Sequence, residues 1–294
     1  MEDRKDIPLA FIKTPVKQSY QNSPPLWRTT EIPNISMVQV TPDKGSRYYE
    51  VTDGDSTWSG KYTSVTSLIG NTLRNFGIER WKENWIRDQL KRYQGETLTD
   101  SLAIQILTAA DKELKRSAEL GIHVHDLIEQ LLHDQTIELN DHTDPIIRAW
   151  LKWRERFIEW ELVGTELGVF NGEHDEGYGG QVDALFRCGN EFMVVDWKTS
   201  SGLYNSSYLQ VSAYAKAIER MNPYMSRVKA CVVRLVNDYP KTKDGKKDRM
   251  ADKKFNGSCE YAMVDTHHWG KTFDYMRATL SGTKSKVVKV KLND

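Results

Sequence analysis

Three ionisable residues fall close together in the stretch GGQVDALFRCGNEFMVVDWKTS, residues 179–200. Asp183 lies within one apolar, strand-like run, Asp196 ends the next such run, and Lys198 follows two residues later. Side chains two residues apart on a strand point to the same side, so Asp196 and Lys198 share a face. Burying a carboxylate is costly unless it is paired with a cation or binds a metal. The spacing therefore indicates either a chemical site or an ion pair.

The chemical interpretation starts from the two carboxylates. Carboxylates on neighbouring strands make a hard, oxygen-rich site of the kind that Mg²⁺ or Mn²⁺ prefers. A lysine beside them supplies a point charge that could hold a phosphate or polarise a water molecule. The same spacing also suits a surface ion pair, and these residues alone leave both interpretations open.

Two predicted helical segments carry further candidates. The segment GIHVHDLIEQLL places Gly121, His125 and Glu129 four residues apart, and hence on one helical face. A single histidine in such a segment is more often structural than a ligand. Gln210 and Tyr214 share one face of a later helix, where an ordinary surface or capping role is also open.

Hydrophobic periodicity predicts the elements that position these residues. Apolar residues at helical spacing predict helices at residues 75–93, 100–134, 144–160 and 205–221. Strand-like runs predict strands at residues 161–170, 178–188, 191–199 and 228–236. This order predicts an α/β (α+β) fold, with a central mixed sheet, flanking helices and an N-terminal helical region.

The same patterns predict the domain organisation. Residues 1–60 look irregular, because six prolines break any helix and only short runs such as SMVQV are strand-like. Residues 61–294 are predicted to form a single domain. Its parts are a helical region at 61–160, a sheet core at 161–265 and a basic tail at 266–294.

Several aromatic residues are predicted to pack in the core or to face a ligand. Trp150, Trp153, Phe157 and Trp160 share one helical face, and such a stripe is typical of core packing. Trp81, Trp85 and Tyr204 could stack unpaired bases, although core packing is the more common role of such residues.

The composition is that of an ordinary globular protein, with 39% hydrophobic and 28% charged residues. No apolar run approaches the roughly 20 residues of a membrane helix. The acidic N-terminus MEDRKDIPLAF disfavours a secretory signal and a mitochondrial presequence. Three widely spaced cysteines exclude a CxxC metal knuckle and favour a reducing compartment. We therefore expect a cytoplasmic location, which would be the host cytoplasm if the chain is viral, and no membrane association.

The net charge of zero hides an asymmetry along the chain. Residues 155–196 hold ten acids against two bases, and residues 239–254 hold seven bases against three acids. An acidic centre beside basic segments suits a cation site next to a surface for a polyanion. A merely solvated loop is equally open for the basic segment, whose candidate phosphate-binding residues are Lys241, Lys243, Lys246 and Lys247.

Taken together, these features resemble the PD-(D/E)XK nuclease superfamily, specifically its RecB-like exonuclease branch. That branch includes phage-type, CRISPR-adaptation and mitochondrial genome-maintenance-type exonucleases. The matching motifs, in the family's order, are GIHVH (121–125), GGQVD (179–183), VVDWK (194–198) and QVSAY (210–214). The stretch YTSVTSLIG (62–70) is also similar to the family's PSVT segment, although a tyrosine-threonine pair stands where proline is common. The resemblance covers roughly residues 62–235 and implies a restriction-endonuclease-like core.

The resemblance implies a role for each matching position. His125, Asp183, Asp196 and the backbone carbonyl of Trp197 would ligate Mg²⁺ or Mn²⁺. Lys198 would position or activate the attacking water.

Other positions would support this site. Glu129 matches an acid found one helical turn after the histidine and would support it. Glu166 falls where several members carry another acid. Gln210 and Tyr214 match a motif that contacts the DNA backbone or braces the site. His123 is set aside, because the glycine-to-histidine spacing selects His125.

The implied function is a metal-dependent DNA exonuclease that acts from DNA ends in recombination, repair or replication. DNA, as single strands or duplex ends, would be its partner, together with a single-strand annealing protein or another replication or recombination protein. No iron–sulfur cluster is expected, since that requires four bracketing cysteines and this chain has three. Two alternatives stay open: a structure-specific endonuclease of the same fold, and a catalytically silent nucleic-acid-binding module.

Overall fold

The computed structural model describes residues 12–13, 17–18, 35–43, 45–54, 58–73, 76–172, 177–222, 225, 227–238 and 256–282. The strands are β1 (Ile12–Lys13), β2 (Lys17–Gln18), β3 (Ile35–Val40), β4 (Tyr48–Asp53), β5 (Gly60–Ser64), β6 (Glu161–Asn171), β7 (Tyr178–Cys188), β8 (Glu191–Lys198), β9 (Lys229–Asp238) and β10 (Asn256–Val264). The helices are α1 (Val65–Thr72), α2 (Phe76–Arg92), α3 (Asp100–Leu132), α4 (Asp144–Arg156), α5 (Asn205–Met221) and α6 (Thr266–Gly282).

All ten strands join one mixed sheet. The order β10-β9-β8-β7-β5-β4-β3-β2 runs across it, and β6 pairs with both β7 and β1. The pairs β6–β7, β7–β8 and β9–β10 are antiparallel, whereas β8–β9 and β5–β7 are parallel. The sheet confirms the predicted α/β (α+β) class with a central mixed sheet and flanking helices.

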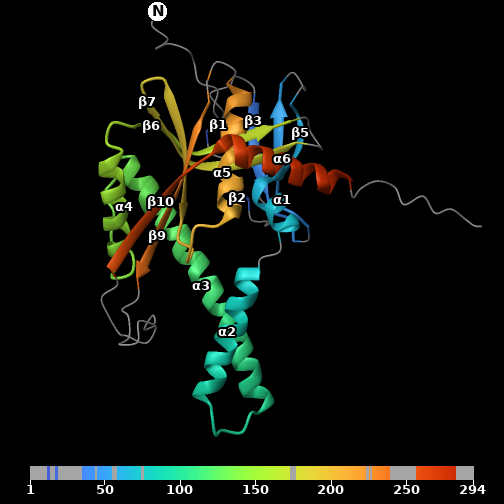
Figure 1. Ribbon diagram of the computed structural model, residues 1–294, viewed down its shortest axis with the longest axis vertical. Helices are drawn as coiled ribbons and strands as arrows, with labels where there is room; N and C mark the ends of the chain where they lie inside the picture. Colours follow the sequence, from blue (N-terminus) through green and yellow to red (C-terminus); the bar gives the residue numbers. More distant parts are fainter. Residues whose placement is uncertain are drawn as a thin grey trace, which may run out of the picture.

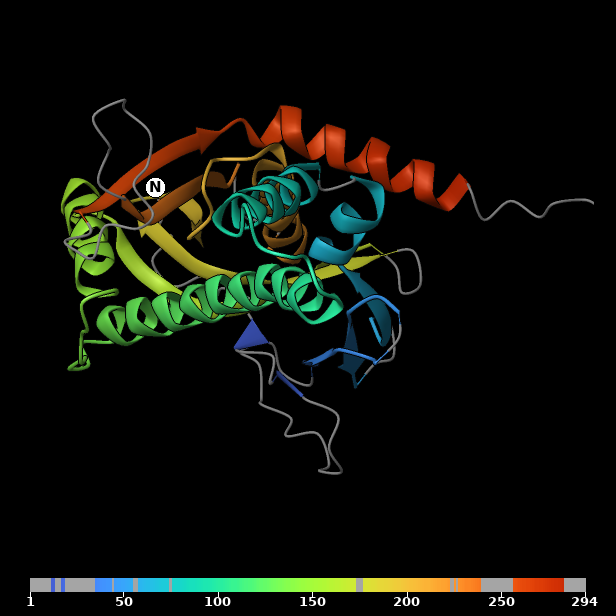
Figure 2. The ribbon, with the colours of Figure 1, turned by 90° about the horizontal axis from the view of Figure 1, so that it is seen from below.

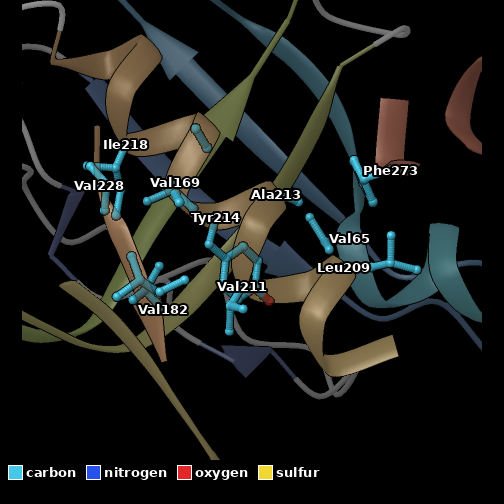
Figure 3. Packing of buried hydrophobic residues seen from close by; sticks show 14 of the residues in the cluster. Val65, Val169, Val182, Leu209, Val211, Ala213, Tyr214, Ile218, Val228 and Phe273 are labelled. Carbon is cyan, nitrogen blue, oxygen red and sulfur yellow. The ribbon is translucent and has the colours of Figure 1, made fainter. Parts of the chain in front are cut away.

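Helices cover both faces of the sheet. Apolar residues of α1, α5 and α6 pack against one face, and those of α3 and α4 pack against the other. Figure 2 shows this sandwich, with α3 along one side of the sheet and α6 on the opposite side. Figure 3 shows part of the first layer, where Tyr214 of α5 and Val65 of α1 belong to one cluster of buried apolar residues. The sheet is therefore buried between two apolar layers, and any polar group that it carries inward needs a partner.

Trp197 of β8 anchors the second layer. Its ring lies edge-on to Trp153 at a centroid distance of 5.0 Å and to Trp150 at 6.1 Å. Phe157 and Trp160 pack at the margin of the same cluster. The predicted Trp stripe of α4 is therefore core.

Helix α2 and the first part of α3 form a hairpin that extends away from the sheet (Figure 1). Lys82 of α2 pairs with Asp111 of α3 at 2.6 Å, and Trp81 stacks on Trp85 within α2. Ile104 and Leu107 of α3 are more than half exposed there. Within the described residues, no helix combines the length and apolar character that crossing a membrane requires.

Two predictions about the ends of the chain differ from the structure. The segment 1–60, predicted to be irregular apart from short runs such as SMVQV, contains β3 and β4, which extend the sheet. Most side chains of β3 and alternate side chains of β4, such as Val51, are buried. The predicted basic tail 266–294 begins with helix α6, since Trp269, Phe273 and Met276 recur at helical spacing and pack against α5 and its neighbours. Strand β10 was not predicted, and it pairs with β9 along its whole length.

Candidate functional site

The candidate site lies at a gap in the pairing of β7. On one edge of this strand, β8 pairs with residues 184–188 and β5 pairs with residues 178–179. Residues 180–183 lie between these two ladders. At the end of the β7–β8 ladder, the Trp197 N–H donates to Asp183 Oδ2 at 2.8 Å instead of to a backbone carbonyl. At this gap, the Asp183 carboxylate therefore takes the place of a backbone carbonyl as the partner of β8.

Asp196 and Lys198 lie beside this gap. The Asp196 side chain is 1% exposed, and that of Lys198 is 25% exposed. Lys198 Nζ donates to Asp196 Oδ1 at 3.0 Å and lies 2.7 Å from Oδ2. Asp196 Oδ2 is nevertheless a buried oxygen without a hydrogen-bond partner among the described residues. The two residues therefore form an ion pair that leaves one carboxylate oxygen without a well-aligned donor.

Two α5 side chains continue this network. Lys198 Nζ also donates to Gln210 Oε1 at 3.2 Å, and Gln210 Nε2 donates to the Tyr214 hydroxyl at 3.0 Å. The ammonium therefore fixes the orientation of the Gln210 amide. Burial holds the pKa of Tyr214 well above its ordinary value, so the hydroxyl stays neutral.

The electrostatics of the pair follow from burial and from close charges. Burial raises the pKa of Asp196 to about 6; the Asp183 charge adds to this rise and the Lys198 ammonium opposes it. Burial alone would lower the pKa of Lys198, but the charges of Asp196 and Asp183 outweigh it and raise that pKa. Lys198 is therefore an ammonium at neutral pH.

Helix α3 brings His125 to the same place. His125 Nε2 lies 2.9 Å from the Trp197 carbonyl oxygen, and Nδ1 lies 3.5 Å from Asp183 Oδ2. The helix comes close to the end of β8 at Gly121: a Cβ added to this glycine would lie 2.9 Å from Thr199 Oγ1. His123, by contrast, is exposed. The glycine of GIHVH thus allows the approach that positions the histidine.

Glu166 of β6 completes the cluster. One potential ligand atom from each of His125, Glu166 and Asp183 lies within 4.8 Å of the others. Glu166 has a φ of 51°, in the left-handed region, just after a register shift between Leu162 and Gly164. Such a conformation costs on the order of 1–3 kcal/mol for a residue with a side chain. Bulged strands re-aim side chains in this way next to functional sites.

Glu129 lies one turn beyond His125 on α3, and its carboxylate is bound by β6. Thr165 Oγ1 donates to Glu129 Oε1 at 3.0 Å and lies 2.9 Å from His133 Nε2. Glu129 thus contacts the residue before Glu166, and its predicted support of His125 stays a prediction. The sequence pattern had not singled out Thr165 or His133.

The two glycines of GGQVD have a packing role. A Cβ at Gly180 would overlap the ring of Tyr214, and one at Gly179 would lie 3.1 Å from the ring of Tyr49. These glycines therefore let the aromatic rings pack directly on β7, next to Asp183.

Arg47 is a further charged group that the sequence pattern missed. It donates from Nε to Ser64 Oγ at 3.2 Å and from Nη2 to Thr66 Oγ1, at the start of α1. Its charge tends to lower the pKa of Lys198, so the two cations lie near each other. Arg47 falls in the segment that was predicted to be irregular, where no periodic signal marked it.

His125, Glu166 and Asp183 together could hold a metal ion, since each offers one ligand atom within 4.8 Å of the others. Carboxylate oxygens are ligands that Mg²⁺ and Mn²⁺ prefer, and the imidazole is a ligand that other transition metals also accept. Asp196 Oδ2 is buried, lies 2.7 Å from Lys198 Nζ and has no well-aligned hydrogen bond among the described residues, so it is an atom that a cation could also contact.

The remaining candidates either fall outside the described residues or lie on other elements. Lys241, Lys243, Lys246 and Lys247 fall outside the described residues. Trp81 and Trp85 are partly buried on the hairpin. Tyr204 is 47% exposed, and its hydroxyl lies 2.8 Å from Ser201 Oγ on the loop after β8.

Comparisons with known proteins give little similarity. A scan against protein-family models and a search of curated proteins find no match. Among solved structures, the crystal structure of SSO0001 is similar at 13% sequence identity, over 67% of this chain and 85% of that chain, with a TM-score of 0.25. A likeness this low carries no argument about activity.

Proposed function

We propose that this protein is a Mg²⁺- or Mn²⁺-dependent deoxyribonuclease with a restriction-endonuclease-like core, of the RecB-like PD-(D/E)XK type. It hydrolyses phosphodiester bonds from DNA ends, as an exonuclease in recombination, repair or replication. One observation carries the proposal: the buried Asp196 carboxylate and its partner Lys198 lie beside Asp183 and His125 at the gap in the β7 ladder. The sequence motifs that resemble this nuclease branch thus come together in space.

His125, Asp183, Asp196, Glu166 and the Trp197 carbonyl would hold the divalent cation. When bound, the cation supplies Lewis-acid polarisation of a phosphoryl group and favours deprotonation of water. His125 Nε2 donates to the Trp197 carbonyl at 2.9 Å, so Nδ1, which lies 3.5 Å from Asp183 Oδ2, is the imidazole nitrogen that would face the cation.

Lys198 acts as a fixed cation in this proposal. Its raised pKa keeps it protonated at neutral pH, which argues against a role as a general base. Its hydrogen bonds to Asp196 and Gln210 account for two of the three ammonium donors. The remaining donor can hold a phosphoryl oxygen or orient a water molecule, and can offset negative charge that develops in the transition state.

Gln210 and Tyr214 brace that cation. The buried Tyr214 hydroxyl accepts from the Gln210 amide, which in turn leaves its carbonyl oxygen toward Lys198. A charge that is already oriented needs no reorganisation during the reaction, so this bracing contributes to catalysis without touching the substrate.

The DNA would reach the site along positively charged surface. Arg47 lies close to Lys198, and the basic segment with Lys241, Lys243, Lys246 and Lys247 follows β9, the neighbour of β8. Cationic side chains of this kind neutralise phosphates. A single-strand annealing or other recombination protein is the partner that this activity would suit.

Digestion of end-labelled single- and double-stranded DNA with Mg²⁺, Mn²⁺ or EDTA tests the proposal. We expect metal-dependent release from ends, no cleavage of closed circular DNA, and loss of cleavage but not of DNA binding in Asp196→Ala. Cleavage of circular DNA would instead indicate an endonuclease. Binding without cleavage under every metal condition would indicate a silent binding module. Substantial Mg²⁺-dependent activity in a folded Asp196→Ala protein would refute the site.

A further inference from the structure

Glu166 holds a backbone conformation that its own residue type disfavours. Its φ of 51° is left-handed, and its carboxylate lies in one cluster with His125 and Asp183. A strained conformation persists only where the surrounding structure over-determines it. Some contact must therefore hold this part of β6 in place.

Thr165, the residue before it, makes such contacts. Thr165 is only 8% exposed, and its hydroxyl donates to Glu129 Oε1 at 3.0 Å. A hydroxyl has one proton, so the 2.9 Å contact with His133 requires His133 Nε2 to donate to Thr165 Oγ1. One threonine oxygen is thus fixed from two directions.

Both partners of Thr165 belong to the end of α3. Glu129 lies in its last turn, and His133 is the residue that caps the helix, with its N–H bound to the Glu129 carbonyl at 3.1 Å. His125 lies one turn earlier on the same helix. The contacts therefore tie the helix that carries His125 to the strand that carries Glu166.

The geometry points to Thr165 as a positioning residue that sets the place of Glu166 relative to His125, with Glu129 and His133 as its two anchors. This inference rests on the proposed metal-dependent function, and it deepens it by assigning the support of one metal ligand. Hydrogen-bonded neighbours of metal ligands typically change metal affinity by about 10- to 100-fold when they are removed.

Mn²⁺ binding measured by calorimetry, without DNA, tests the inference. Thr165→Val keeps the shape and removes the hydroxyl, and we expect it to weaken Mn²⁺ binding about 10-fold or more. Thr165→Ser keeps the hydroxyl and should bind Mn²⁺ nearly as the unaltered protein does. Thr108→Val is the matched control, because among the described residues the Thr108 hydroxyl bonds to the Ile104 and Gln105 carbonyls, in exposed turns of α3.

A double-mutant cycle separates positioning from general stabilisation. If Thr165 acts through Glu166, Thr165→Val should have almost no further effect on Mn²⁺ affinity in a Glu166→Ala protein. An equal loss in both backgrounds would overturn the inference, as would unchanged affinity in Thr165→Val. Should Thr165→Val fail to fold, His133→Ala at the exposed helix cap replaces it in the same cycle, with the same two outcomes decisive.

The same measurements distinguish failure of the proposed nuclease function from failure of the positioning role of Thr165. Mn²⁺ binding that follows this pattern in a protein that cleaves no DNA would refute the nuclease and leave the positioning role standing. If the unaltered protein cleaves DNA with Mn²⁺ while Thr165 proves uncoupled from Glu166, the positioning role alone fails. No Mn²⁺ binding by the unaltered protein would overturn both.

Discussion

The backbone N–H of Trp197 donates to the Asp183 carboxylate at 2.8 Å, at the point where β7 and β8 stop pairing. A side chain thereby satisfies a backbone donor that the sheet would otherwise bind. The same carboxylate oxygen lies 3.5 Å from His125 Nδ1. The end of one ladder thus creates the place where residues from β7, β8 and α3 converge.

Removal of the Lys198 ammonium should separate chemistry from metal binding. In Lys198→Ala, Mn²⁺ affinity at pH 8 should be unchanged or slightly higher, since a nearby cation opposes metal binding. Single-turnover cleavage should fall by ~10² or more, as when one preorganised donor is removed. Lys198→Arg should restore little of the cleavage rate, because a planar guanidinium cannot replace a compact ammonium.

Lys115→Ala on the exposed face of α3 is the control for this experiment, because its side chain is 79% exposed. Lys115→Ala should leave the Mn²⁺ affinity and the single-turnover cleavage rate unchanged. Collapse of metal binding and melting of the fold in Lys198→Ala, with residual activity that tracks metal occupancy, would make Lys198 a structural counter-ion.

The stability of the metal-free protein should depend on the titration of Asp196. Its pKa is raised from 3.8 to about 6 by burial, so the folded state binds this proton more tightly than the unfolded state. The resulting stabilisation is present below pH 3.8 and is lost as the pH rises through 6. A shift of this size corresponds to about 2–3 kcal/mol.

Urea unfolding of EDTA-treated protein between pH 4 and 7 measures this effect. The stability of Asp196→Asn relative to the unaltered protein should rise across this range, since the amide does not titrate. Parallel stability curves for the two proteins would contradict the raised pKa. The slope of stability against pH decides this test. Loss of the carboxylate that pairs with Lys198 changes the free energy of unfolding of Asp196→Asn by an amount that is the same at every pH in this range.

The basic segment after β9 should bind DNA phosphates. Changing Lys241, Lys243, Lys246, Lys247 and Arg249 to Ser should weaken DNA binding and flatten the plot of log affinity against log salt by ~0.7–0.9 for each phosphate that is no longer neutralised. A matched variant removes five charges elsewhere, at Lys61, Lys91, Lys112, Lys115 and Lys271. An unchanged slope in the first variant, or an equal change in both, would mean that the segment is merely solvated or acts only through net charge.

Gly180 should tolerate no side chain. A Cβ there would overlap the Tyr214 ring, so Gly180→Ala should destabilise the fold by about 1–3 kcal/mol and lower cleavage by displacing Tyr214. Gly70→Ala in α1 is the matched control, because nothing lies within 4 Å of its added Cβ. That variant should be neutral or stabilised by up to roughly 1 kcal/mol in thermal unfolding. Equal stability of the two variants would show that β7 and α5 can move apart.

Local periodicity was enough to predict most of the elements around the site. The helical spacing of Trp150 and Trp153 predicted α4, because that pattern matches the burial of one helical face. The continuous apolar run around Val194 predicted β8, which is buried on both faces. The strand-like run SMVQV lies in β3, whereas β4, which is six residues long, was missed. The burial of β4 depends on pairing with β3 and β5, which are contacts between separate segments that no local pattern reports.

Residue types and their spacing were enough to establish the chemical inventory of the site: Asp183, Asp196 and Lys198 at strand spacing, and a histidine four residues after Gly121. The folded arrangement supplied the rest. The approach of Arg47 to Lys198 and the hydrogen bonds of Thr165 to the end of α3 join residues far apart in the chain. The left-handed turn at Glu166 is likewise held by its surroundings, because an isolated glutamate would relax from it. Residue types fix what a site can bind, whereas strand pairing and helix packing fix which of those residues meet.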